Sequence, residues 1–360
     1  MRPGSRNFIF PAVDPFLCVD CGLCLNRCPS NKSAGTEQNV KAVYAAWSKD
    51  KKNRRTSSSG GIFTVLAKSI LRNGGAVAGA VWNDAFHPQH VLVDTEEDLA
   101  LLQGSKYAQS ITSDIYIRIK EQLLCNKQVL FSGTPCQVAA LKAFLGKEYD
   151  GLFLIDVVCH GVPSNAMLDR YYAQFGDRIK SVKLRKKDPY WDYCYVQLEF
   201  EHLPSYKALT IDDDYFNLFN IGYSLRESCH NCQYATTHRQ SDVTLADFWG
   251  YTAHSFRTRN YNKGTSLILV NSEKGKRMIK TIRKDIFLEE STIDKAMQGN
   301  KCLSEPFKLP PDKLTSFWKD YEAGAAVKEL NEKYAANTFQ LPKHLALRRV
   351  YYKWKWILGK

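Results

Sequence analysis

The sequence predicts a mixed α/β (α+β) protein in which an N-terminal cysteine loop precedes a core of parallel βαβ units. Two observations predict this fold class. Apolar strands alternate with amphipathic helices along residues 76–163, and such a strand–loop–helix repeat is typical of a parallel sheet. Four cysteines crowd into residues 18–28, ahead of the first predicted strand. We expect four parts in order: a cysteine segment at 1–40, two parts of the core at 41–130 and 131–300, and a basic, aromatic extension at 301–360.

The composition limits the classes of function. The chain has 360 residues, of which 44% are hydrophobic and 24% charged, as in an ordinary globular protein. No apolar run reaches about 18 residues and no apolar leader is present, so we expect a cytoplasmic protein. Eleven cysteines in that compartment favour metal or redox chemistry over disulfides. The net charge of +13 favours acidic substrates, acidic electron carriers or anionic lipid, and without a nucleic-acid-binding motif we expect no nucleic-acid partner.

The N-terminal cysteines have the spacing C-x₂-C-x₂-C-x₃-C-P of a bacterial ferredoxin loop, which holds a [4Fe-4S] cluster. The candidate ligands are Cys18, Cys21, Cys24 and Cys28. A disulfide knot or a zinc knuckle is the alternative, although zinc usually takes two separated cysteine pairs. Only one such motif is present, so the fourth ligand stays open between Cys28 and, in reserve, Cys302.

A candidate anion site follows the first predicted strand, Val40–Trp47, and a basic polar loop, Lys49–Arg55. Small hydroxyls and glycines stand directly before a predicted helix at 62–71: Ser57, Ser58, Ser59, Gly60 and Gly61. Free N–H groups, the positive end of the helix dipole and hydroxyl donors together suit a phosphate. A serine-rich N-cap without a ligand would look similar.

Two predicted core strands end in loops that carry cysteine. Gln128–Phe131 leads to Cys136, and Leu152–Val158 leads to Cys159. Because the carboxyl ends of parallel strands meet at one edge of a sheet, we expect these two thiols side by side. Other expected strands lie at 76–82 and 91–93, and helices at 115–124 and 138–145.

The second half of the chain carries another cysteine pair, Cys229-x₂-Cys232. Alone, the pair suits a redox dithiol or half a zinc site. With Cys136 and Cys159 it could supply four thiolates to a second cluster. The other expected features are a strand-rich stretch at 179–200 with a basic turn at Lys183–Lys187, a strand at 267–270, and helices at 274–282 and 293–297.

The chain ends in a basic, aromatic tail at 348–360. Such a tail can lie on an anionic membrane surface, which would put the protein at the inner face of the membrane. The alternative is a terminal helix that docks on the body of the protein.

Several motifs in order resemble the family of coenzyme F420 hydrogenase/dehydrogenase beta subunits, over nearly the whole chain to about residue 300. The motifs are Thr56–Gly61, Gly104–Tyr107, Ser132–Gln137, Cys159–Pro163, Cys229-x₂-Cys232 and Asp247–Gly250. The resemblance implies the family's N-terminal domain at 41–130 and its C-terminal domain at 131–300. It also implies an FAD beside a [4Fe-4S] cluster on Cys136, Cys159, Cys229 and Cys232. The implied FAD cradle is the Ser57–Gly61 loop with Lys106, Tyr107, Ser132, Gly133 and Thr134.

Two functions are predicted, both with two clusters and FAD. In the first, reduced ferredoxin feeds electrons through the clusters to FAD, which reduces a small organic substrate; a nucleotide-sugar of cell-surface polysaccharide synthesis is one candidate. The alternative is an electron-transfer subunit of a hydrogenase or dehydrogenase complex that acts on F420 or a similar carrier. His160 follows a candidate cluster ligand, so it is our candidate catalytic proton donor; its other role would be to bond a loop carbonyl.

Overall fold

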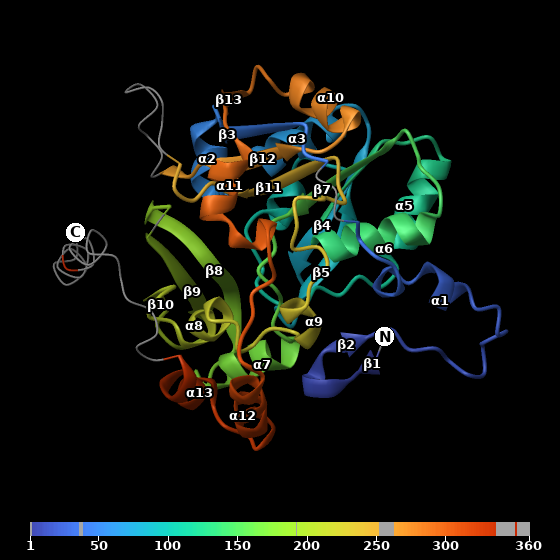
Figure 1. Cartoon of the computed structure of the whole chain (residues 1–360). Coiled ribbons are helices and arrows are strands. Elements are labelled where there is room, and N and C mark those ends of the chain that lie inside the picture. Colours follow the sequence, from blue (N-terminus) through green and yellow to red (C-terminus); the bar gives the residue numbers. More distant parts are fainter. Residues whose placement is uncertain (1, 36–38, 192, 252–262, 336–349, 351–360) are drawn as a thin grey trace.

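The computed structural model describes residues 2–35, 39–191, 193–251, 263–335 and 350. Its centre is an eight-stranded sheet in the order β13-β3-β12-β11-β7-β6-β4-β5 (Figure 1). Neighbours among β4, β6, β7 and β11 pair in parallel, whereas β5, β12 and β13 pair antiparallel with their neighbours. The predicted mixed α/β class is therefore confirmed. The strands are β3 (Ala42–Ser48), β4 (Ala76–Trp82), β5 (Pro88–Val93), β6 (Val129–Gly133), β7 (Leu152–Val157), β11 (Val243–Asp247), β12 (Ser266–Val270) and β13 (Ile286–Glu290).

Helices cover both faces of this sheet, because successive strand residues point to opposite faces. Ile268 packs with α3, α4 and α10, whereas its neighbours Leu267 and Leu269 pack with α11. Val129 and Phe131 likewise pack with α5 and α6. These helices are α3 (Ile62–Leu71), α4 (Leu99–Leu102), α5 (Ile115–Leu124), α6 (Pro135–Leu145), α10 (Glu273–Thr281) and α11 (Ile293–Gly299).

A second core forms between a three-stranded antiparallel sheet, in the order β10-β9-β8, and four helices. Tyr171, Val196, Leu218 and Trp318 are buried in it. Its elements are α7 (Asn165–Ala173), β8 (Ile179–Tyr190), β9 (Tyr193–Phe200), β10 (Tyr206–Leu209), α8 (Asp214–Asn220), α12 (Pro311–Glu322) and α13 (Val327–Tyr334). Residues 311–334, which we expected in a C-terminal extension, thus pack in the same core as 165–220.

Most of the N-terminal segment lies on the outside of this body, with α1 beside α6 (Figure 1), but Phe8 is buried in the second core. Its short elements are β1 (Arg2–Pro3), η1 (Ser5–Asn7), β2 (Ile9–Phe10), α1 (Leu23–Arg27) and η2 (Pro29–Asn31). Three further short helices are α2 (Lys51–Thr56), α9 (Glu227–His230) and η5 (Lys301–Leu303). In the part of the chain that the structure describes, no helix combines the length and apolar character needed to cross a bilayer. All but one residue of the predicted tail at 348–360 lies outside the described residues.

Two local predictions are wrong. Lys49–Arg55 is not a loop, because the Asp50 carboxylate accepts the backbone N–H groups of Lys52 (2.8 Å) and Asn53 (3.1 Å) and so begins α2. The basic stretch Lys183–Lys187 is not a turn but lies within β8.

Candidate functional site

Four candidate thiols lie at the carboxyl edge of the parallel strands. Cys136 is in the first turn of α6, after β6, and Cys159 follows β7. Because β6 and β7 pair in parallel, their following loops are neighbours, as predicted. Cys229 lies in α9 and Cys232 just after it. Burial raises the pKa of the Cys159 thiol well above its usual value, and the three other thiols raise it further, so the four lie close together. We call these four the second cysteine group.

Every sulfur of the second cysteine group has a hydrogen-bonding partner. The pairs are the Gly161 N–H with Cys159, the Val162 N–H with Cys229, the Tyr234 and Ala235 N–H groups with Cys232, and the Thr134 hydroxyl, at 3.1 Å, with Cys136. Backbone N–H groups directed at sulfur favour the thiolate and tune iron–sulfur sites. All four thiols are free of disulfides.

The thiols of the second cysteine group are not gathered around a single metal-ion position. Within the described ranges, no three or more His, Cys, Asp or Glu side chains are arranged to hold one metal ion. A four-iron cluster makes a different demand, because each cysteine binds a different iron and the thiols therefore stand farther apart.

Buried Arg239 joins the two segments that carry these cysteines. Its guanidinium pairs with Asp156 of β7 at 3.1 Å, and the two side chains are 1% and 0% exposed. It also donates to the carbonyl oxygens of Val157 (3.1 Å) and Tyr234 (3.2 Å). Arg239 and Asp156 were not among the predicted site residues, because their pairing spans distant parts of the sequence.

Replacement of Arg239 by leucine should destabilise the fold by about 3–5 kcal/mol, since it leaves the Asp156 carboxylate buried without its partner. Urea unfolding measures the loss. The control is Arg178→Leu, because Arg178 pairs with Glu201 at 3.7 Å and is 82% exposed; there the expected change is below about 1 kcal/mol. Equal losses in the two variants would contradict the role of Arg239.

His160 bonds a backbone carbonyl oxygen, as in the second of the two roles predicted for it. Its Nε2 lies 3.1 Å from the Phe219 carbonyl oxygen, and its ring packs against Phe219 and Phe307. Burial lowers the pKa of His160. A catalytic role for His160 stays a prediction.

Cys302 lies near the second cysteine group. Its sulfur is 4.0 Å from His160 Nδ1. Burial raises the pKa of the Cys302 thiol, and the nearby Cys232 thiol raises it further. These neighbours favour Cys28 over Cys302 as the fourth ligand of the first cluster.

The first cysteine loop, residues 18–28, has mostly exposed thiols. Cys18, Cys21 and Cys24 are exposed and Cys28 is half-buried. Gly22 has the left-handed φ of +66° that lets the chain bend sharply into α1.

The predicted anion loop is tightly bonded to the rest of the protein. Ser58 Oγ accepts the backbone N–H of Ser105 at 3.0 Å, so the Ser57–Gly61 and Gly104–Tyr107 motifs lie together. Ser57 and Ser59 hydroxyls donate to protein oxygens at 3.0 Å. Gly61 begins α3 with φ of +83° and closely approaches Asn53, a conformation that suits glycine.

The other predicted cradle residues have structural partners. Lys106 Nζ donates to the carbonyl oxygens of Leu101, Gln103 and Gly104 at 3.0–3.2 Å, at the end of α4, and burial lowers its pKa to about 8. The Ser132 carbonyl is 3.1 Å from His90 Nε2, and Thr134 caps α6. Tyr107 packs against Phe216 and Phe219. Gly133 ends β6.

A buried cationic group beside the anion loop was not predicted. It comprises Arg54, Arg185 and Lys187, with Asp247 as the carboxylate paired with Arg185. Lys187 Nζ donates to the Ser59 carbonyl oxygen at 2.6 Å, and burial lowers the pKa of Lys187 to about 7 and that of Arg54 to about 10. Arg185 Nη2 is buried without a hydrogen-bond partner among the described residues. Arg185 and Lys187 are two residues apart in β8, so they share one face of the strand, and this spacing is the sequence signal that could have indicated the group.

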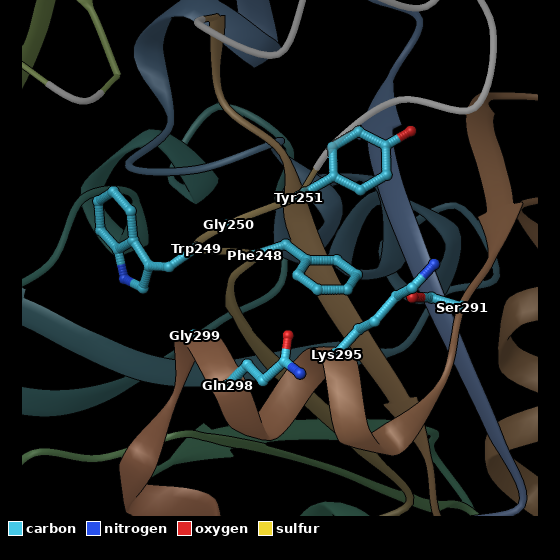
Figure 2. Close-up of a pocket in the computed structure, with 8 residues that line it drawn as sticks. All are labelled: Phe248, Trp249, Gly250, Tyr251, Ser291, Lys295, Gln298 and Gly299. Carbon is cyan, nitrogen blue, oxygen red and sulfur yellow. The ribbon is translucent and has the colours of Figure 1, made fainter. Parts of the chain in front are cut away.

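An aromatic cavity adjoins this cationic group. The Trp191 and Trp249 rings stack at 4.5 Å, and Trp191 Nε1 donates to Asp247 at 2.7 Å. Beyond Trp249 lies a cavity of about 200 Å³. Figure 2 shows Phe248, Trp249 and Tyr251 on one side of it and Lys295 and Gln298 of α11 on another.

The fold matches that of a chain in the F420-reducing [NiFe] hydrogenase complex from Methanosarcina barkeri. The TM-score is 0.51 at 17% identity, and the match covers 82% of this chain and 91% of that one. At this identity the likeness shows the fold alone.

Two relatives of the chain are named for oxidoreductase reactions. The chain is 24% identical over 225 residues to the F subunit of F(420)H(2) dehydrogenase from Methanosarcina mazei, covering 60% of this chain and 59% of that protein. It is 29% identical over 154 residues to the coenzyme F420-dependent sulfite reductase of Methanocaldococcus jannaschii, covering 42% and 24%. The chain thus matches less than two thirds of the length of each relative, 59% of one and 24% of the other. Both relatives are oxidoreductases or oxidoreductase subunits.

More particularly, two family models match the chain, both describing the beta subunit of coenzyme F420 hydrogenase/dehydrogenase. The model of its N-terminal part matches residues 43–115, and the model of its C-terminal part matches residues 126–296. The chain belongs to the family of coenzyme F420 hydrogenase/dehydrogenase beta subunits, which confirms the resemblance seen in the sequence motifs.

Proposed function

We propose that the protein is an electron-transfer subunit of an F420-linked or similar dehydrogenase or reductase complex. One observation carries the proposal: four thiols, each with a hydrogen-bonding partner, lie next to a buried cationic group along one sheet edge. The relatives are named for F420-linked reactions, and one is named as a subunit. They favour this function over a ferredoxin-fed reductase of polysaccharide synthesis, for which they offer no support.

The second cysteine group is the proposed site of one cluster, which supplies one-electron transfer when bound. Its residues fit the group, since all four thiols are free and near one another. Val162, Gly161 and Tyr234 direct N–H groups at sulfur, and Arg239 holds the two cysteine segments in place. Cys18, Cys21, Cys24 and Cys28 remain the proposed ligands of the other cluster.

The cationic group is the proposed FAD site. FAD, when bound, would convert single electrons into hydride. Three buried cations face one carboxylate, so the group has an excess of positive charge that suits the two phosphates of a dinucleotide. The unpartnered Arg185 Nη2 and the α3 N-terminus at Gly61 supply donors for such a group. Lys187 and Arg54 also bond protein carbonyl oxygens, so the case for phosphate contact at this group rests on its buried positive charge and on the unpartnered Arg185 Nη2.

The order of strands puts the two proposed sites next to one another. Asp247 ends β11 and Cys159 follows β7, and β11 and β7 pair in parallel, with Leu245 opposite Val157. Electrons could therefore pass along the sheet edge without crossing the core. The aromatic cavity beyond Trp249 opens next to the cationic group and is the proposed place of the acceptor.

The test is anaerobic purification with iron and flavin counted per chain. We expect about eight iron atoms, as in two four-iron clusters, with one FAD and a visible spectrum bleached by dithionite. Reoxidation of the reduced protein by F420, and not by nucleotide-sugars, would separate the proposed function from the polysaccharide alternative. A protein that takes up neither iron nor flavin would overturn the proposal.

A further inference from the structure

The segment after the first cysteine loop is bonded to the segment after Cys232. We call this junction, of residues 29–35 and 39 with residues 233–240, the seam. Its hydrogen bonds are Gln233 Nε2 to Pro29 O (3.1 Å), Ala34 N to Gln233 Oε1 (3.0 Å), Gln240 Nε2 to Ala34 O (3.1 Å), Asn39 Nδ2 to Arg239 O (2.8 Å) and Arg239 N to Asn39 Oδ1 (2.8 Å). Gln233 thus binds the N-terminal segment with both its donor and its acceptor.

On its N-terminal side, the first cysteine loop (residues 18–28) follows an anchored stretch, in which Phe8 is buried and Gln109 bonds both the N–H and the carbonyl oxygen of Ile9. Helix α1 buries none of its residues, and three of the four thiols are exposed. Apart from the seam, Arg27 Nη1 attaches the loop to α6 through the Ala143 carbonyl oxygen at 3.0 Å. Between the anchor at Phe8 and residue 39, the loop is therefore positioned by polar contacts, one with α6 and the others with the segment that also carries Cys232.

Tyr234, next to Gln233, lies in the same segment as Cys232. Its side chain is buried, and its carbonyl oxygen is bonded to buried Arg239. The thiols of Cys136, Cys232 and Cys28 all lie near enough to Tyr234 to act on its hydroxyl, so thiols of both cysteine groups are its neighbours.

We propose that the seam holds the first cluster within electron-transfer reach of the second, with Gln233 as the positioning residue and the buried Tyr234 side chain beside it. The inference rests on the proposed function, since it needs clusters at both cysteine groups. The rate of electron transfer between two centres falls steeply as their separation grows. The first cysteine loop has no core of its own, so the bonds of the seam are needed to keep its cluster close to the second one.

The experiment is electron paramagnetic resonance of the dithionite-reduced protein. Two reduced clusters held close together broaden each other's signals, so the natural protein should give a coupled spectrum. The double variant Gln233→Ala with Gln240→Ala removes three of the seam's bonds, and we expect loss of the coupling with iron and flavin content unchanged. The control Gln174→Ala changes an exposed glutamine at the end of α7 and should keep the coupling.

Two further variants test Tyr234. Tyr234→Leu removes the ring, lets water approach Cys232, and should shift the midpoint potential of the second cluster upward, because water stabilises the more negative reduced state. Tyr234→Phe keeps the ring and should keep the potential. Coupling that survives in the double variant would overturn the inference alone. A natural protein without two iron signals would overturn the proposed function and the inference together.

Discussion

Cys159→Ser is expected to remove about half of the protein's iron, the four atoms of one cluster, and to stop electrons from reaching the flavin. All three other thiols of the second cysteine group act on Cys159, so it lies among them. A serine hydroxyl stays protonated near neutral pH and is a poor ligand for iron. Loss of a residue that merely orients a ligand already costs about 10–100-fold, so loss of the ligand should lower F420 reduction by at least about 100-fold.

The matched control makes the same chemical change at Cys125, an exposed thiol at the end of α5. Cys125→Ser should keep the iron content, the visible spectrum and the rate. Iron assay and reduced-state spectra measure both variants. Full iron in Cys159→Ser, with the second cluster's signal intact, would exclude Cys159 as a ligand.

The sequence predicts the parts of the site that follow from strand order. Cys136 and Cys159 each come after an apolar strand of one parallel sheet, so their meeting at one edge follows from the general geometry of such sheets. The glycine bend at Gly22 and the helix at 62–71 are also local features, set by nearby residues. These predictions needed no knowledge of distant contacts.

The electrostatics of the site depend on distant contacts and were missed. Lys187 bonds the Ser59 carbonyl across more than a hundred residues of sequence, and Arg239 pairs with Asp156 across more than eighty. A basic run such as Lys183–Lys187 is usually solvated, which is why it was interpreted as a turn. Only the packing of β8 against the anion loop shows that two of its cations are buried.

For the serine loop, the local sequence pattern predicts the position of a candidate anion site but not the residues that would supply its charge. The Ser57–Gly61 loop does lie beside a cationic group, but its Ser57 and Ser59 hydroxyls already donate to protein oxygens. The charge that would hold a phosphate comes from Arg54, Arg185 and Lys187 instead. This division of roles makes Lys187 the most informative single residue in the proposed FAD site.

Lys187→Met is expected to weaken FAD binding by about 10- to 100-fold, since a hydrogen bond to a charged group contributes about 1.5–3 kcal/mol. The change also removes the bond to the Ser59 carbonyl that holds the anion loop. The matched control is Lys186→Met: Lys186 is the neighbour along β8 and bonds Gln197 at 3.0 Å. Titration of flavin-free protein with FAD measures both affinities.

The pH dependence of FAD binding distinguishes loss of the Lys187 charge from a change in the shape of the site. Burial lowers the pKa of Lys187 to about 7 in the free protein, and a bound diphosphate would raise it again by favouring the ammonium form. FAD binding should therefore take up a proton, so that its affinity is highest below pH 7 and falls as the pH rises above 7. Lys187→Met should abolish this fall while Lys186→Met retains it. An affinity that does not change between pH 6 and pH 9 in the natural protein would place the phosphates away from Lys187.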